Sequence, residues 1–157
     1  MADDIFLFKT SGIPLFGKCF GGEYCKLHPD HSLQTGFLAA IYSYSQESFG
    51  DEIQSVIFNE IKLDFKIDKK NEIILVFANP VKLGTEIIKE QLNRAMDRFL
   101  EKFSDKIGDI IIEGQYQDFE NDLIELKVVS NPSMGNISTI IPRKSLWSRF
   151  ISKILGK

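Results

Sequence analysis

Residues 72–79 read EIILVFAN, and every side chain from Ile73 to Ala78 in this stretch is apolar. An unbroken apolar run of this length is typical of a strand that is buried on both faces, whereas a strand with one wet face alternates apolar and polar side chains. Asn79 and Pro80 end the run. The stretch therefore predicts the central strand of a sheet that is covered on both sides.

Four further strand candidates surround this run. Residues 5–9 (IFLFK) and 13–20 (IPLFGKCF) flank the turn sequence TSG, so we interpret them as a hairpin. Residues 53–61 (IQSVIFNEI) and 61–68 (IKLDFKID) alternate in part, and the polar turn DKKN separates the second of them from the central strand. Together these segments predict a sheet of five strands.

The first helix is predicted over residues 30–50 (DHSLQTGFLAAIYSYSQESFG). Its apolar side chains at helical spacing are expected to face the core, and they are Leu33, Phe37, Ala40, Ile41 and Tyr44. Gly36 costs about 1 kcal/mol relative to alanine in a helix, which indicates close packing on another element. Aromatic residues are favoured at interfaces, so three of them are interface candidates: Tyr42, Tyr44 and Phe49. For Tyr44, burial in the domain's own core is the alternative.

Two more helices follow the central strand. The longer one is predicted from Lys82 to Ile107, and its apolar face consists of Leu83, Ile87, Leu92, Ala95, Met96, Phe99, Phe103 and Ile107. The second is contained in residues 109–129 (DIIIEGQYQDFENDLIELKVV), where Gly114 interrupts the apolar pattern and obscures the start.

The C-terminal segment differs in composition from the rest. Residues 1–130 hold all 22 acidic side chains and 14 of the 19 lysines and arginines, a net charge of −8, whereas residues 131–157 hold five basic side chains and no acidic one. We divide the chain into a domain over residues 1–129, a linker over 130–142 and a basic amphipathic helix over 143–157. The helix is expected to bind a membrane or a partner through Arg143, Lys144, Leu146, Trp147, Arg149, Phe150, Ile151, Lys153, Ile154 and Leu155. Docking of its apolar face on the chain's own domain is the alternative.

Composition limits the class of protein. A chain of 157 residues with 43% hydrophobic residues has the size and core of one domain. The N-terminus lacks the features of a secretory signal, and no apolar stretch approaches the roughly 20 residues of a membrane span. We therefore expect a cytoplasmic protein, peripheral at a membrane if the tail binds lipid, with both cysteines reduced. The acidic body argues against nucleic-acid binding.

Residues 19–31 (CFGGEYCKLHPDH) contain both cysteines and both histidines. Four potential zinc ligands are present, but the spacing C-x5-C-x2-H-x2-H is not a usual one for zinc. We interpret Cys19 as an apolar thiol on a strand and Cys25 to His31 as a polar connection into the first helix. A metal-binding or cysteine-dependent protein that uses this loop is the alternative.

Motifs of common enzyme classes are absent. The sequence contains no P-loop, no G-x-G-x-x-G, no G-x-S-x-G and no H-E-x-x-H. The acidic residues are scattered over expected turns and helix faces. We therefore expect no enzyme, no catalytic residue, no cofactor and no metal.

The order of elements, β-β-α-β-β-β-α-α, with the segments FKTSGIPLF, HSLQTGFLAAIYSYSQESFG, IKLDFKID and EIILVFAN, resembles the longin domain over residues 4–129 and the related roadblock domains. The resemblance implies an α+β fold: a five-stranded antiparallel sheet with the first helix on one face and the two later helices on the other. The chain lacks the heptad repeats of a longin SNARE, so the non-SNARE type is expected.

The resemblance also implies a function. Longin domains act without catalysis in membrane traffic or in the regulation of small GTPases, usually by pairing with another longin or roadblock domain. The expected partners are therefore another such domain or a second copy, a small GTPase, and an anionic membrane through the tail. A structural subunit of a coat or tethering complex is a further alternative. Exposed sheet edges also favour pairing.

Overall fold

The computed structural model describes residues 2–21, 31–108, 110, 112 and 114–129. Its elements follow the expected order, with a short 3-10 turn after the second helix. They are β1 (Asp4–Lys9), β2 (Pro14–Cys19), α1 (His31–Phe49), β3 (Ser55–Ile57), β4 (Ile61–Asp68), β5 (Ile73–Pro80), α2 (Thr85–Phe103), η2 (Ser104–Lys106) and α3 (Phe119–Glu125). The predicted linker and tail, residues 130–157, lie outside the described residues.

The five strands form one antiparallel sheet in the order β2-β1-β5-β4-β3. The central position of β5 is confirmed: β1 pairs with it from Lys9↔Ile73 to Asp4↔Ala78, and β4 pairs along its other edge. The side chains of β5 are buried from Ile73 to Ala78. The unbroken apolar run therefore arises because this strand has a neighbour on each edge and a helix layer on each face.

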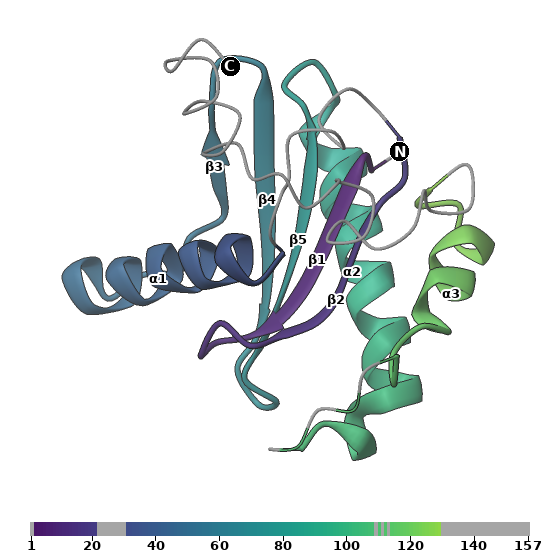
Figure 1. Ribbon diagram of the computed structural model, residues 1–157. Helices are drawn as coiled ribbons and strands as arrows, with labels where there is room; N and C mark the ends of the chain where they lie inside the picture. Colours follow the sequence, from purple (N-terminus) through teal and green to yellow (C-terminus); the bar gives the residue numbers. More distant parts are fainter. Residues whose placement is uncertain (1, 22–30, 109, 111, 113, 130–157) are drawn as a thin grey trace, which may run out of the picture.

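Helices cover both faces of the sheet, as Figure 1 shows, with α1 on one side and α2 and α3 on the other. Alternate side chains of a strand point to opposite faces, so β5 contributes to two cores. Ile73, Leu75 and Phe77 belong to the core under α2 and α3. Their neighbours on the other face, Ile74 and Val76, pack with Leu38 and Ala39 of α1.

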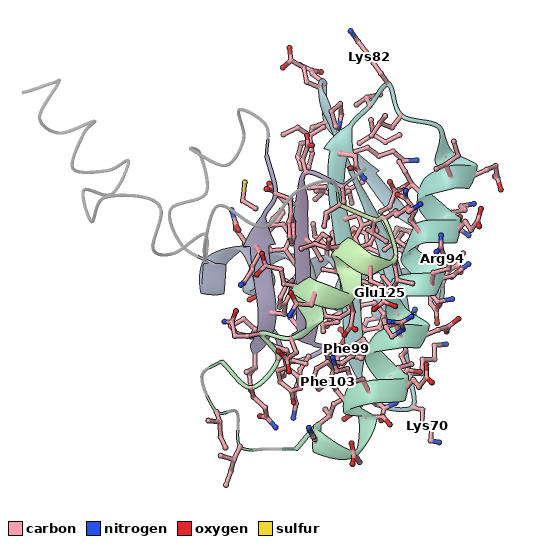
Figure 2. The ribbon with its side chains drawn as sticks, turned by 90° about the vertical axis from the view of Figure 1, so that its right-hand side faces the viewer. Lys70, Lys82, Arg94, Phe99, Phe103 and Glu125 are labelled. Carbon is pink, nitrogen blue, oxygen red and sulfur yellow. The ribbon has the colours of Figure 1, made fainter. Side chains whose placement is uncertain are left out.

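An aromatic cluster joins α2 to the segment that carries α3. Phe99 is fully buried, and its ring centroid lies 5.1 Å from that of Phe119 and 5.4 Å from that of Tyr116. Phe103, one turn further along α2, packs on Phe99 at 5.2 Å (Figure 2). Aromatic pairs at these separations stabilise beyond the area they bury.

Several predicted boundaries and faces are corrected by the structure. The third strand has only three residues, although the carbonyl of Gln54 still accepts a hydrogen bond from the N–H of Phe65 at 2.9 Å. On α2 the buried position is Ile88, while Ile87 is 64% exposed. The apolar pair at 87 and 88 fits either face, and only packing distinguishes them.

The predicted core face of α1 is also wrong. Phe37 is 56% exposed and Tyr44 64% exposed, whereas Leu38 and Ala39 are buried on the sheet. Both sides of this helix carry apolar and small residues, so periodicity did not distinguish the core side. The helix is oriented instead by contact with the β1–β2 turn, where the hydroxyl of Thr35 donates to the carbonyl of Gly12 at 2.8 Å.

The backbone of Gly36 lies against the same turn, but the glycine that this contact requires is Gly12. A Cβ atom on Gly12 would lie 3.2 Å from the Cα of Gly36, so the two backbones approach each other without intervening side chains. Gly12 also has a φ of +94°, a conformation that side chains disfavour. The contact therefore depends on glycine at position 12, whereas a Cβ atom at position 36 would meet no other atom within 4 Å.

Replacement of Phe99 by alanine is expected to lower the free energy of unfolding by about 3–5 kcal/mol, because it leaves a cavity among packed rings. Chemical denaturation followed by circular dichroism measures this change. The matched control is Phe49→Ala, since Phe49 is 71% exposed; its effect should stay below about 1 kcal/mol. Equal effects of the two substitutions would contradict the described core.

Candidate interaction surface on helix α1

The outward side of α1 is almost without charge. In its 19 residues, Glu47 is the only acidic side chain, and there is no lysine or arginine. The exposed positions, which we call the α1 surface, are Gly36, Phe37, Ala40, Ser43, Tyr44, Glu47, Ser48 and Phe49. Exposed helices normally carry charged residues on the solvent side, whereas the centres of protein interfaces are depleted in charge and enriched in aromatic residues.

Two of the three aromatic interface candidates belong to this surface. Tyr44 and Phe49 are exposed, and their rings meet edge to face with centroids 5.8 Å apart. Tyr42 is instead half-buried and packs against the core between α1 and the sheet. Phe37, which the sequence placed in the core, joins the surface. The missed signal was the scarcity of charge on the helix, with Glu47 as its one acidic side chain and no lysine or arginine.

An open sheet edge lies on the same side of the molecule. β3 is the last strand of the sheet, and in Figure 1 the C-terminal end of α1 extends past it. The hydrogen bonds made by Gln54 and Phe58 point toward β4, so by alternation the backbone groups of Ser55 and Ile57 point outward. Ile57 is 64% exposed and Phe58 49% exposed. An uncovered edge of this kind is available for pairing with another strand.

The cysteine and histidine segment takes a different form from the one expected. Cys19 at the end of β2 is fully buried and disulfide-bonded, so the expectation that both cysteines are reduced is wrong at this position. The other cysteine of the chain, Cys25, lies outside the described residues, as does His28, and His31 begins α1. A disulfide-bonded sulfur is not a thiolate ligand. Within the described ranges, no group of three or more potential metal ligands comes together.

The predicted membrane-binding residues of the tail, Arg143 to Leu155, fall outside the described residues. Among the helices that the structure describes, none is long and apolar enough to cross a membrane.

Comparison with known proteins places the fold. No family model matches the chain, and no curated protein matches its sequence. Among solved structures, MglB of Myxococcus xanthus aligns with a TM-score of 0.54 at 14% identity, over 69% of this chain and 81% of that one. The mammalian SRP receptor aligns at 0.48 and 17% identity, over 80% of this chain and 91% of that one. A roadblock/LC7 domain from Streptomyces avermitilis aligns at 0.46 and 10% identity, over 67% and 84%.

The likeness to MglB concerns the fold, because the two sequences share few residues. With the five-stranded antiparallel sheet, this likeness confirms the expected longin/roadblock-like architecture.

Proposed function

We propose that this longin/roadblock-like domain is a non-enzymatic adaptor that pairs with a second domain of the same fold, either another copy of itself or a homologue. The observation that carries the proposal is the α1 surface, which has a single charged side chain, Glu47, and exposed aromatic residues. The setting in small-GTPase regulation or membrane traffic rests on the longin resemblance of the sequence.

The α1 surface favours another helix as its partner. Gly36 and Ala40 are one turn apart and exposed, so a partner helix can approach this part of α1 closely. Phe37 and Tyr44 flank that position and offer large apolar areas. Burying such a side chain fully stabilises the complex by about 1.5–3 kcal/mol. The freedom that the two molecules lose on association offsets part of this gain. The open edge of β3 adds backbone groups that an antiparallel strand of the partner satisfies.

Substitution of Ala40 by arginine is expected to convert dimers, or complexes with a homologous domain, to monomers, because the long charged side chain separates the two helices. Light scattering at high micromolar concentration measures the mass. The thermal transition should change little, since Ala40 is exposed. Glu90→Arg on the outer side of α2 is the control and should leave the mass unchanged. A wild-type chain that stays monomeric and captures no homologous domain refutes the proposal.

The second part of the proposal concerns residues 143–157, which we propose bind an anionic membrane surface. Basic residues there add about 1 kcal/mol each near anionic lipid, and the six apolar side chains supply area for interfacial burial. Trp147 is the only tryptophan of the chain, so its fluorescence reports on this segment without a label.

Anionic vesicles are expected to shift the Trp147 emission to the blue, neutral vesicles less so, and added salt should weaken the response. Replacing Arg149 and Lys153 by glutamate should abolish the shift and leave the thermal transition nearly unchanged. If the emission of the protein without vesicles is already blue-shifted and protected from quencher, the tail is docked on its own domain and the membrane proposal fails.

Affinity capture of the full chain from its native cell tests the setting. A nucleotide-dependent small GTPase among the captured proteins is expected for a GTPase regulator. Capture of a stable multi-subunit assembly without a GTPase would contradict that role and support a structural subunit of a coat or tethering complex.

A further inference from the structure

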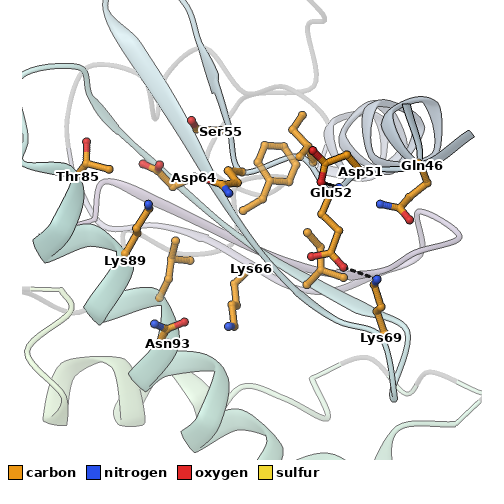
Figure 3. Close-up of a pocket in the computed structure, with 16 residues that line it drawn as sticks. Gln46, Asp51, Glu52, Ser55, Asp64, Lys66, Lys69, Thr85, Lys89 and Asn93 are labelled. Atoms are coloured by element: carbon orange, nitrogen blue, oxygen red, sulfur yellow. Dashed lines mark hydrogen bonds and ion pairs between the residues drawn. The ribbon is translucent and has the colours of Figure 1, made fainter. Parts of the chain in front are cut away.

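A polar groove of about 520 Å³ lies at the edge of the sheet, between α2 and the C-terminal end of α1. Figure 3 shows its three sides. α2 contributes Thr85, Lys89 and Asn93 on one side, and β4 contributes Asp64 and Lys66 to the floor. The third side is the connection between α1 and β3, which Glu52 joins to the β4–β5 turn through an ion pair with Lys69 at 2.7 Å. The volume lies within the range of about 300–1,000 Å³ that is usual for small-molecule sites.

Charged side chains occupy the sheet face that α2 covers here. Lys62, Asp64 and Lys66 alternate along β4 and therefore share one face, and Asp64 is the cross-strand neighbour of the core residue Phe77. Lys62 is only 7% exposed and Asp64 only 3%. A buried ion pair is often no more stabilising than apolar residues of similar volume, so packing alone gives little reason for charges at this place.

One oxygen of Asp64 lacks a partner. Lys62 Nζ lies 3.1 Å from Oδ1 of Asp64 and donates to the Thr85 hydroxyl, also at 3.1 Å. Oδ2 is buried, and no hydrogen-bond donor of the described residues reaches it. A buried carboxylate oxygen without a donor costs free energy, on the order of 1–3 kcal/mol or more. A carboxylate only accepts hydrogen bonds, so a ligand that stabilises this oxygen must carry a donor.

The side of the groove formed by α2 attracts anions. Figure 3 shows the Lys89 side chain directed from α2 toward the Asp64 carboxylate, although within the described part of the chain the two make no ion pair. Thr85 opens the 19-residue helix α2, whose N-cap Gly84 supplies no side-chain hydrogen bond to the first turn. The positive end of the helix dipole and Lys89 act on this side, and Lys66 adds a positive charge from the floor. On the opposite side, the Asp51 carboxylate accepts the backbone N–H of Glu52 at 2.8 Å.

We propose that this groove binds a phosphate monoester that also carries hydroxyl groups, such as a phosphorylated sugar or polyol. The phosphate pairs with Lys66 and Lys89, which supply charge-assisted hydrogen bonds. A hydroxyl of the ligand donates to Oδ2 of Asp64, as carboxylates do with sugar hydroxyls in other phosphate-ester sites. A ligand with only one of the two groups leaves either the lysines or the carboxylate without a partner. The same chemistry is present in a soluble sugar phosphate and in a phosphoinositide headgroup.

Titration of the full chain with ribose 5-phosphate, inositol trisphosphate and inorganic phosphate, followed by NMR of the backbone amides, tests the site. Both esters are expected to shift the amides of residues 62–66 and 85–89, and inorganic phosphate to bind at least about tenfold more weakly, because it lacks the hydroxyl contact. Lys89→Ala should weaken ester binding about tenfold. The control Lys82→Ala removes an exposed lysine that does not line the groove (Figure 2) and should change nothing.

Asp64→Asn is expected to reduce the preference for the esters over inorganic phosphate. Should that variant fold poorly by its thermal transition, Thr85→Val, at an exposed position, tests the same side of the groove and should weaken binding. The proposal is overturned if millimolar ester leaves the amides of residues 62–66 and 85–89 unshifted. It is also overturned if Lys89→Ala and Lys82→Ala weaken ester binding equally.

Vesicles containing phosphatidylinositol bisphosphate, compared with phosphatidylserine vesicles of equal charge, separate the two sources of the ligand. If the protein prefers the phosphatidylinositol bisphosphate vesicles and Lys89→Ala removes this preference, the ligand is a lipid headgroup. If the protein binds the esters in solution but shows no such preference, the ligand is soluble. The vesicle comparison is made with the variant that carries glutamate at positions 149 and 153, so that the tail does not contribute to binding.

Discussion

Every layer of the molecule contacts β5. Its backbone pairs with β1 on one edge and with β4 on the other, and its side chains alternate between two separate cores. The helix pair α2 and α3 depends on Ile73, Leu75 and Phe77, and α1 depends on Ile74 and Val76. A strand with two paired edges and two covered faces tolerates only apolar side chains, because any polar group would lose its hydration without gaining a partner. The position of the other elements follows from that constraint.

The two helix layers differ in what they leave exposed. The layer of α2 and α3 is sealed by aromatic packing and by ion pairs: Arg98 and Lys102 of α2 both reach the buried carboxylate of Asp122 on α3. The α1 layer is a single helix with one acidic side chain and several exposed apolar ones. Near its N-terminal end α1 packs against the β1–β2 turn, which fixes the orientation of the helix on the sheet. A surface that is already ordered loses little conformational entropy when a partner covers it.

The charged residues of β4 show how a strand near the edge can serve a purpose other than packing. Asp64 lies opposite Phe77 across the strand pair, yet it is part of a polar groove instead of the apolar core. Beyond the three residues of β3, the outer edge of β4 has no strand beside it among the described residues, and this leaves room for the groove. Gln46 of α1 and Ser55 of β3 line the groove, so a partner domain on the end of α1 and the β3 edge would lie next to it.

The sequence by itself determined the elements, their order and the centre of the sheet. An unbroken apolar run in residues 73–78 and the turn signals around it depend only on local composition, and they identified β5 correctly. It did not determine which side of α1 faces the core, because apolar residues occupy both sides, nor whether Ile87 or Ile88 is buried. Contacts between distant segments determine which residues are buried, namely the contact of Gly12 with Gly36 and the packing of α2 on the sheet. The groove was also invisible in the sequence: Lys62, Asp64, Thr85 and Lys89 come together only when α2 packs across β4, and tertiary structure alone leaves Oδ2 of Asp64 buried without a donor.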